Sequence, residues 1–406
     1  MRPGIFAGLA AAVLFTAATA FAQTQPTAPA APAPSGIPTP PGGIPVGPLI
    51  VYPAVDFAQG YDDNLFLRPS NRRSASFTTV SPQLRAEGKT GPHKFDVGLR
   101  IDDSRNHSSP ADSYTNYALT GNAELVFSGR ESLKLSAVRR HGEDPRGTTD
   151  RNVSTEPDQY DVTGIDGVFK YGAAGAQGRI EVDGGAQATR YTNNRSFTNA
   201  ADRDVLKLGG TFFWRVAPRT ELLFQAQRGG VDYKLASSTL DSTDTRYLFG
   251  VKWEATAATT GTAKFGRMYK DFDSASRPDF SGSSWDVGVR WSPLTYSVFD
   301  FTSAKQTSES TGVGDTIVGK SYGVTWSHAW SSRLRTQALA NFRNDTFPGA
   351  VVSRSDDTTS FGLKASYDFR RWLRLGAEFT HSERESNDPG LNYKRNLLLF
   401  TVGGTL

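Results

Sequence analysis

From about Val51 onward, the chain alternates apolar and polar residues over many short segments. In Lys94–Asp102, the odd positions from Phe95 to Ile101 are apolar, and the even positions carry charges or glycine. Successive side chains of a strand point to opposite faces, so this segment has one apolar face and one charged face. The same pattern returns in Arg179–Ala188, Trp285–Trp291, Arg333–Arg343, Phe361–Arg370 and Leu373–Thr380. The pattern predicts an all-β fold with many amphipathic strands.

The connections between these segments alternate between short and long. Short ones such as Ser331–Ser332 often follow an aromatic residue, and long polar ones include Arg140–Gln159 and Thr307–Gly319. Outer-membrane barrels have short periplasmic turns and long outer loops, with aromatic residues at the membrane boundary. We therefore expect an antiparallel transmembrane β-barrel of about 18 strands (16–18), with both termini in the periplasm. The alternative is a soluble many-stranded binding protein or propeller, which gives no reason for this regular alternation.

Composition and the N-terminal region agree with secretion. Only 37% of the 406 residues are hydrophobic, as expected where alternate residues alone meet lipid. The formal charge of +4 arises from 45 basic and 41 acidic residues, a balance that does not indicate nucleic-acid binding. We interpret residues 1–22 as a signal peptide, 23–50 as a Pro/Ala-rich periplasmic linker and 51–406 as the barrel. The linker is either a tether for a periplasmic partner or a spacer.

The sequence predicts neither an enzyme nor a metal or cofactor site. Cysteine is absent, the five histidines have no metal-ligand spacing, and no GxSxG motif occurs. Acidic loop segments such as Asp356–Asp357 are interpreted as solvated loops, or as sites that bridge lipopolysaccharide through cations. We expect outer-membrane lipid and lipopolysaccharide as partners of the barrel.

The charged faces of the strands predict a polar lumen, because a barrel of this size leaves an aqueous channel. Charges facing lipid at mid-membrane would cost about 2–4 kcal/mol for each Arg or Lys. The charges that face the lumen either brace the wall through ion pairs or form a surface that selects solutes. In the second case, Arg333, Arg335 and Arg343 would favour anions locally. The predicted lumen-lining residues are Arg100, Asp102, Arg290, Arg333, Arg335, Arg343, Arg374 and Glu378.

Two segments carry resemblances. Asn396–Leu406 is an amphipathic final strand that resembles the signal for the barrel-assembly machinery, although Leu406 stands where that signal usually has Phe. The segment GYDDNLF (Gly60, Tyr61, Asp62, Asp63, Asn64, Leu65 and Phe66) follows the expected first strand Val51–Gln59. Its short polar side chains suit a strand end and a turn. The segment also resembles the opening signature of the putative beta-barrel porin 2 family.

That resemblance implies an outer-membrane barrel associated with export of exopolysaccharide or capsular polysaccharide, with periplasmic export proteins as partners. It implies no catalytic residues. Gly60, Tyr61, Asp62, Asp63, Asn64 and Phe66 are carried over as a family motif with no role assigned. The resulting interpretation is a passive conduit for secreted polysaccharide. A general or solute-selective diffusion porin is the alternative.

Overall fold

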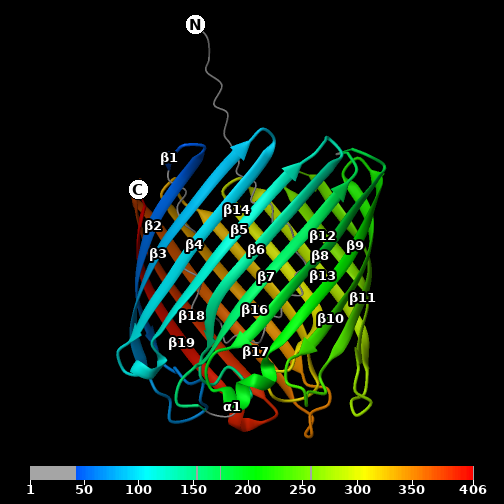
Figure 1. Cartoon of the computed structure of the whole chain (residues 1–406). Helices are drawn as coiled ribbons and strands as arrows, with labels where there is room; N and C mark the ends of the chain where they lie inside the picture. The colour runs from blue at the N-terminus through cyan, green and yellow to red at the C-terminus, as the bar shows by residue number, and fades with distance from the viewer. Residues whose placement is uncertain (1–42, 152–153, 174, 257, 406) are drawn as a thin grey trace.

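The computed structural model describes residues 43–151, 154–173, 175–256 and 258–405, which form a closed antiparallel β-barrel (Figure 1). The expected all-β barrel of 18 strands is thus confirmed. The strands of the barrel are β2 (Leu49–Asp62), β3 (Ala75–Thr90), β4 (His93–Asn106), β5 (Tyr114–Val126), β6 (Glu131–Asp144), β7 (Asp158–Tyr171), β8 (Gly178–Tyr191), β9 (Arg203–Ala217), β10 (Thr220–Tyr233), β11 (Ser242–Thr256), β12 (Thr259–Phe272), β13 (Phe280–Leu294), β14 (Ser297–Glu309), β15 (Thr316–Ala329), β16 (Leu334–Thr346), β17 (Ser355–Arg370), β18 (Leu373–Ser386) and β19 (Tyr393–Thr405).

The remaining elements are short. Strand β1 (Ile44–Val46) pairs with the start of β2, outside the ring of 18. Within the described ranges, no helix is long and apolar enough to cross a membrane. The helical segments are α1 (Arg195–Thr198), η1 (Pro110–Asp112), η2 (Asn199–Ala201) and η3 (Pro389–Leu391).

Each barrel strand pairs with its neighbour in sequence, and β19 pairs with β2 from Leu397↔Asp62 to Thr405↔Ala54. The ring therefore has no free edge over this length, which satisfies the backbone polar groups that lipid could not. The outward positions carry large apolar side chains that remain exposed in the isolated chain, such as Val97 (52%), Leu208 (64%) and Phe249 (59%). The alternation read from the sequence thus separates an outer apolar face from an inner polar one.

The two ends of the barrel differ. At one end the connections are short; residues 91–92 between β3 and β4 and residues 172–177 between β7 and β8 are examples. Strand β2 begins and β19 ends at this end. At the other end lie longer connections, of which 63–74 and 145–157 are examples (Figure 1). We call these the turn end and the loop end. Aromatic side chains at the turn end include Phe127, Trp214, Trp291 and Trp330, all of them exposed.

The strands extend further than the sequence pattern suggests. The first barrel strand begins at Leu49 rather than Val51, and the connection expected over Ser292–Leu294 lies instead at 295–296. Residues 43–50 of the expected linker include β1, while 1–42 lie outside the described residues. At the loop end, strand pairing continues through polar residues such as Thr243 and Asp271, where apolar alternation has already stopped. The boundaries of alternation mark the apolar band and not the strand ends.

Candidate functional site

The acidic pair of the GYDDNLF motif joins the first strand of the barrel to the last. Both Asp62 and Asp63 lie where β2 reaches the loop end, beside the start of β19. The carboxylate of Asp62, only 1% exposed, accepts from Arg395 Nε at 2.8 Å and Nη2 at 2.6 Å. The carboxylate of Asp63 accepts from the backbone and the side-chain amide of Asn396, both at 2.6 Å.

The third polar residue of the motif, Asn64, is fully buried. Its Nδ2 donates to the carbonyl of Arg68 at 2.8 Å and to the carbonyl of Lys394 at 2.9 Å. Its Oδ1 accepts from the Arg68 amide at 3.0 Å, and its own amide donates to Asp62 Oδ1 at 2.9 Å. Asn64 therefore folds the first loop onto the last strand. We call Asp62, Asp63 and Asn64 with residues 394–396 the seam.

The other motif residues have separate positions. Tyr61 is exposed on the outer face, and Gly60 faces the ring of Phe77, where an added Cβ would lie 2.1 Å from the ring. Phe66 lies under the guanidinium of Arg146, which is 4.2 Å from the ring centroid. This contact joins the first long loop to the connection between β6 and β7.

The structure places seven of the eight predicted lumen residues on the inner face, each in an ion pair. Arg333 lies instead in the turn 330–333 and is exposed. The pairs are Arg100–Asp102 (2.5 Å), Arg290–Asp300 (2.7 Å), Arg335–Asp368 (3.2 Å), Arg343–Asp345 (2.7 Å), Arg374–Asp368 (2.5 Å) and Glu378–Lys364 (3.6 Å).

The predicted arginine group of β16 is not brought together. Arg335 and Arg343 are eight residues apart along one strand, which separates them by about 26 Å. Arg335 lines a pocket of about 330 Å³ near the turn end, together with Lys364 and Gln337. Because both arginines have carboxylate partners, they do not form a shared patch of free positive charge.

A hairpin tip narrows the loop end. The pairing of β14 with β13 stops at Lys305↔Trp285, whereas its pairing with β15 continues to Glu309↔Thr316. Beyond the break, the tip turns towards the interior, and Thr316 and Ile317 are fully buried. We call residues 306–318 the inner hairpin. The sequence predicted an outer loop over Thr307–Gly319, so the inward fold of this segment is a correction.

A buried cluster joins the inner hairpin to β12 and β10, two and four strands away from β14 in the ring. Glu309 accepts from Lys270 Nζ at 2.8 Å and from the hydroxyl of Tyr233 at 2.9 Å. Lys270 has no exposed side-chain surface and also pairs with Asp244 at 3.1 Å. A fully buried ammonium needs such partners, because unpaired burial of a charge costs several kcal/mol.

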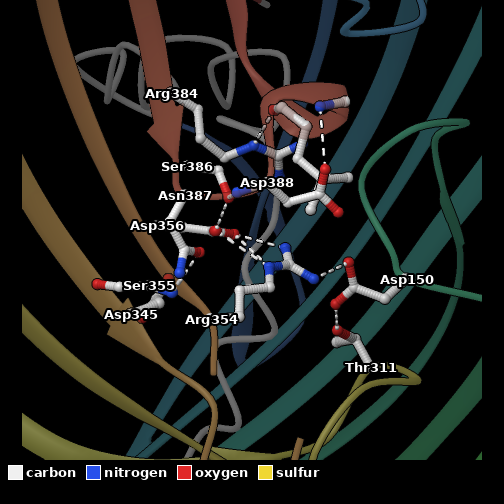
Figure 2. A network of polar contacts seen from close by, with 12 residues as sticks. Asp150, Thr311, Asp345, Arg354, Ser355, Asp356, Arg384, Ser386, Asn387 and Asp388 are labelled. Carbon is white, nitrogen blue, oxygen red and sulfur yellow. Dashed lines mark hydrogen bonds and ion pairs between the residues drawn. The ribbon is translucent and has the colours of Figure 1, made fainter. Parts of the chain in front are cut away.

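Four segments of the chain meet at the mouth of the barrel (Figure 2). Asp150, on the connection from β6 to β7, accepts from Arg354 Nη1 at 2.6 Å and from Thr311 Oγ1 at 2.9 Å. Arg354 also donates from Nε to Asp356 at 3.0 Å, and Asp356 accepts from Ser386 at 2.6 Å. We call these five residues the mouth network.

The mouth network spans the barrel, because the strands that carry Asp150 lie almost opposite those that carry Thr311 and Arg354 in the ring order. The side chains of Arg354 and Asp150 are 8% and 10% exposed. Burial lowers the pKa of the Arg354 guanidinium, but its hydrogen bonds to Asp356 and Asp150 outweigh burial and leave that pKa raised. Arg354 therefore stays charged at any physiological pH.

The sequence gives little warning of the inner hairpin and the mouth network. The turn residues Gly312 and Gly314 look like any outer loop, and only the apolar pair Ile317–Val318 beside them suggests burial. Within the described part of the chain, no three His, Asp or Glu side chains are grouped so that they could hold a metal ion.

Comparisons with known proteins agree with this architecture. The sequence profile of the putative beta-barrel porin 2 family matches residues 38–404. The chain belongs to this family. The resemblance carried by GYDDNLF is thereby confirmed, and members of this family are outer-membrane β-barrels of porin type. No curated protein matches the sequence.

Solved structures share the fold at low sequence identity. OpdK of Pseudomonas aeruginosa, crystallised with vanillate, has a TM-score of 0.51 and 10% identity, covering 88% of this chain and 99% of OpdK. A BenF-like porin from Pseudomonas fluorescens Pf-5 has a TM-score of 0.50 and 12% identity, with coverage of 88% and 99%. The FrpB iron transporter of Neisseria meningitidis has a TM-score of 0.47 and 12% identity. The match covers 82% of this chain and 63% of FrpB.

Proposed function

We propose that this protein is a selective outer-membrane channel for small polar solutes, with the loop end outside the cell and both termini in the periplasm. The observation that carries the proposal is the inner hairpin, which the mouth network fixes across the loop end. A polar wall and a narrowed mouth together favour passage of small hydrated molecules over passage of a polymer. The fold shared with OpdK makes vanillate a suitable trial solute.

The wall charges support weak ion selectivity. The seven inner residues predicted from the sequence all pair with an opposite charge at 2.5–3.6 Å. Arg335 and Arg374 share the carboxylate of Asp368, whereas Arg100, Arg290 and Arg343 each have a carboxylate of their own. Selectivity in this channel would then depend mainly on the size of the opening at the mouth, and less on a ring of free charge.

Export of exopolysaccharide or capsular polysaccharide, with periplasmic export proteins as partners, remains the second candidate. The family resemblance implies it. It requires the inner hairpin and the segment around Asp150 to move aside, because together they cross the path of an extended polymer. Deleting the gene distinguishes the two functions: small-solute uptake falls under our proposal, whereas surface polysaccharide is lost under the second.

The test of the proposal uses purified protein in liposomes and planar bilayers. Liposome swelling with sugars of increasing size should show entry of mono- and disaccharides and exclusion of longer oligosaccharides. Arg354→Met removes the ion pair with Asp150 and should raise the single-channel conductance or its flicker. Arg333→Met, at an exposed turn arginine, is the matched control and should leave both unchanged. Equal entry of short and long sugars into wild-type liposomes would refute the proposal.

A further inference from the structure

The outer face of the barrel carries a belt of charges close to the loop end. Several cations of the belt have a carboxylate partner on a neighbouring strand. Examples are Arg139 with Asp161 at 2.7 Å and Lys394 with Glu383 at 2.6 Å. Opposite charges facing each other across strands stabilise a sheet by roughly 0.2–1 kcal/mol. A cation of the belt without such a partner therefore needs another explanation.

Three neighbouring cations of the belt form such an exception. Among the residues that the structure describes, Arg267, Lys305 and Lys320 have no ion pair. Lys305 and Lys320 face each other directly across β14 and β15. Lys305 Nζ donates to Ser283 Oγ at 3.0 Å, and Ser283 is the cross-strand partner of Arg267. Two ammonium groups opposed in register repel each other, so the arrangement is unfavourable unless an anion lies between them.

The position of the three cations fits the membrane boundary. Going along each strand towards the turn end, the next outward residues are Phe265 before Arg267, Ser303 and Phe301 before Lys305, and Tyr322 after Lys320. Phe265, Phe301 and Tyr322 are exposed on the apolar band. Arg and Lys on the lipid face are tolerated at the interface, where they cost about 0–1 kcal/mol, but not at mid-membrane. The cations thus stand at the depth of the lipid headgroups.

We infer that Arg267, Lys305 and Lys320, with the hydroxyl of Ser283, form a binding site for the phosphate groups of an outer-leaflet glycolipid, the lipid A part of lipopolysaccharide. This inference rests on the proposed orientation with the loop end outside. The three cations occupy β12, β14 and β15, three strand steps that span about 14 Å. That width accommodates a disaccharide headgroup with a phosphate at each end, while the acyl chains lie along Phe301 and Tyr322 on the apolar band below.

Arginine and lysine suit this ligand in different ways. The planar guanidinium of Arg267 can hold a phosphate by two hydrogen bonds, and the ammonium groups of Lys305 and Lys320 act as point charges. The ring of Tyr269 lies 5.9 Å from the Arg267 guanidinium, and that of Trp285 lies 5.8 Å from Lys305 Nζ. These rings limit how far the two cations can turn towards solvent.

The experiment measures binding of lipid A to the full-length purified protein in detergent by native mass spectrometry. Three probes are compared: bisphosphorylated lipid A, lipid A without phosphates, and inorganic phosphate. Wild type should bind the bisphosphorylated form and should not bind the other two. The triple variant R267Q/K305Q/K320Q should bind it about a hundredfold more weakly, since each basic side chain at an anionic surface contributes roughly fivefold.

A control variant, R139Q/K394Q, removes two outward cations of the same belt that already have carboxylate partners. It should bind lipid A within about twofold of wild type. Unchanged binding by the triple variant, or equal binding of dephosphorylated lipid A by wild type, would overturn the site. Binding of inorganic phosphate alone at the same residues would overturn its assignment to a lipid. The conductance of the triple variant should match wild type, so failure of this site is distinguishable from failure of the channel function.

Discussion

Replacing Asn64 by alanine tests the role of the seam. The substitution removes two hydrogen bonds donated by Nδ2 and one accepted by Oδ1, all between 2.8 and 3.0 Å, at a residue with no exposed surface. Each hydrogen bond contributes about 1 kcal/mol, and a buried backbone group left unsatisfied costs about 1–3 kcal/mol. Water at the barrel rim can replace part of the loss. We therefore expect Asn64→Ala to lower the free energy of unfolding by about 2–4 kcal/mol.

The assay is urea unfolding of the barrel refolded in detergent micelles, followed by tryptophan fluorescence and by the mobility shift of the folded band in unheated gels. Asn122→Ala is the matched control, because Asn122 is exposed and its side chain donates a single hydrogen bond, to Asp96 at 3.1 Å. It should cost about 1 kcal/mol or less. If Asn64→Ala costs no more than Asn122→Ala, the seam does not stabilise the closed barrel and the assignment of the motif is wrong.

Other expectations follow from the inner hairpin and the wall. Lys270→Met should leave the carboxylates of Glu309 and Asp244 buried without their cationic partner, while Glu309 keeps only the hydroxyl of Tyr233, and the free energy of unfolding in urea should fall by about 3–5 kcal/mol. Gly349→Ala should loosen the mouth, because Gly349 has φ +77° and an added Cβ would lie 2.0 Å from the Asp315 carboxylate. The single-channel conductance should rise or become noisy, and an unchanged conductance trace would contradict this prediction. In a potassium chloride gradient the reversal potential should stay close to zero, because the predicted wall arginines are paired with carboxylates. A large reversal potential of either sign would contradict the weak ion selectivity proposed for the channel.

Much of the fold follows from local sequence pattern. Alternation in segments such as Lys94–Asp102 determines which face meets lipid, because the period of a strand is two and a charge at mid-membrane is costly. The alternation of short and long connections predicts the number of hairpins. It also places the start of the first strand and the end of the last strand at the same end of the barrel. These features depend on neighbouring residues alone, so one sequence suffices to predict them.

The mouth could not be predicted in the same way. The partners of Asp150 are Thr311 and Arg354, which lie 161 and 204 residues after Asp150 in the sequence. No local period links such residues, and an inward-folded hairpin has the same polar composition as a solvated loop. The pairing of wall arginines was similarly hidden, since Arg335 and Arg374 share Asp368 from three different strands.

The same distance along the chain gives the seam a consequence for biogenesis. Its contacts join residues more than three hundred positions apart, from Asp62 to Arg395 and from Asn64 to the carbonyl of Lys394. Between β2 and β19, a slip of two residues would keep every side chain on its proper face and leave most ladder hydrogen bonds intact. It would separate Asp62 from Arg395 and Asp63 from Asn396. The seam therefore favours the correct register when the barrel closes, because only that register satisfies the hydrogen bonds and the ion pair of its side chains.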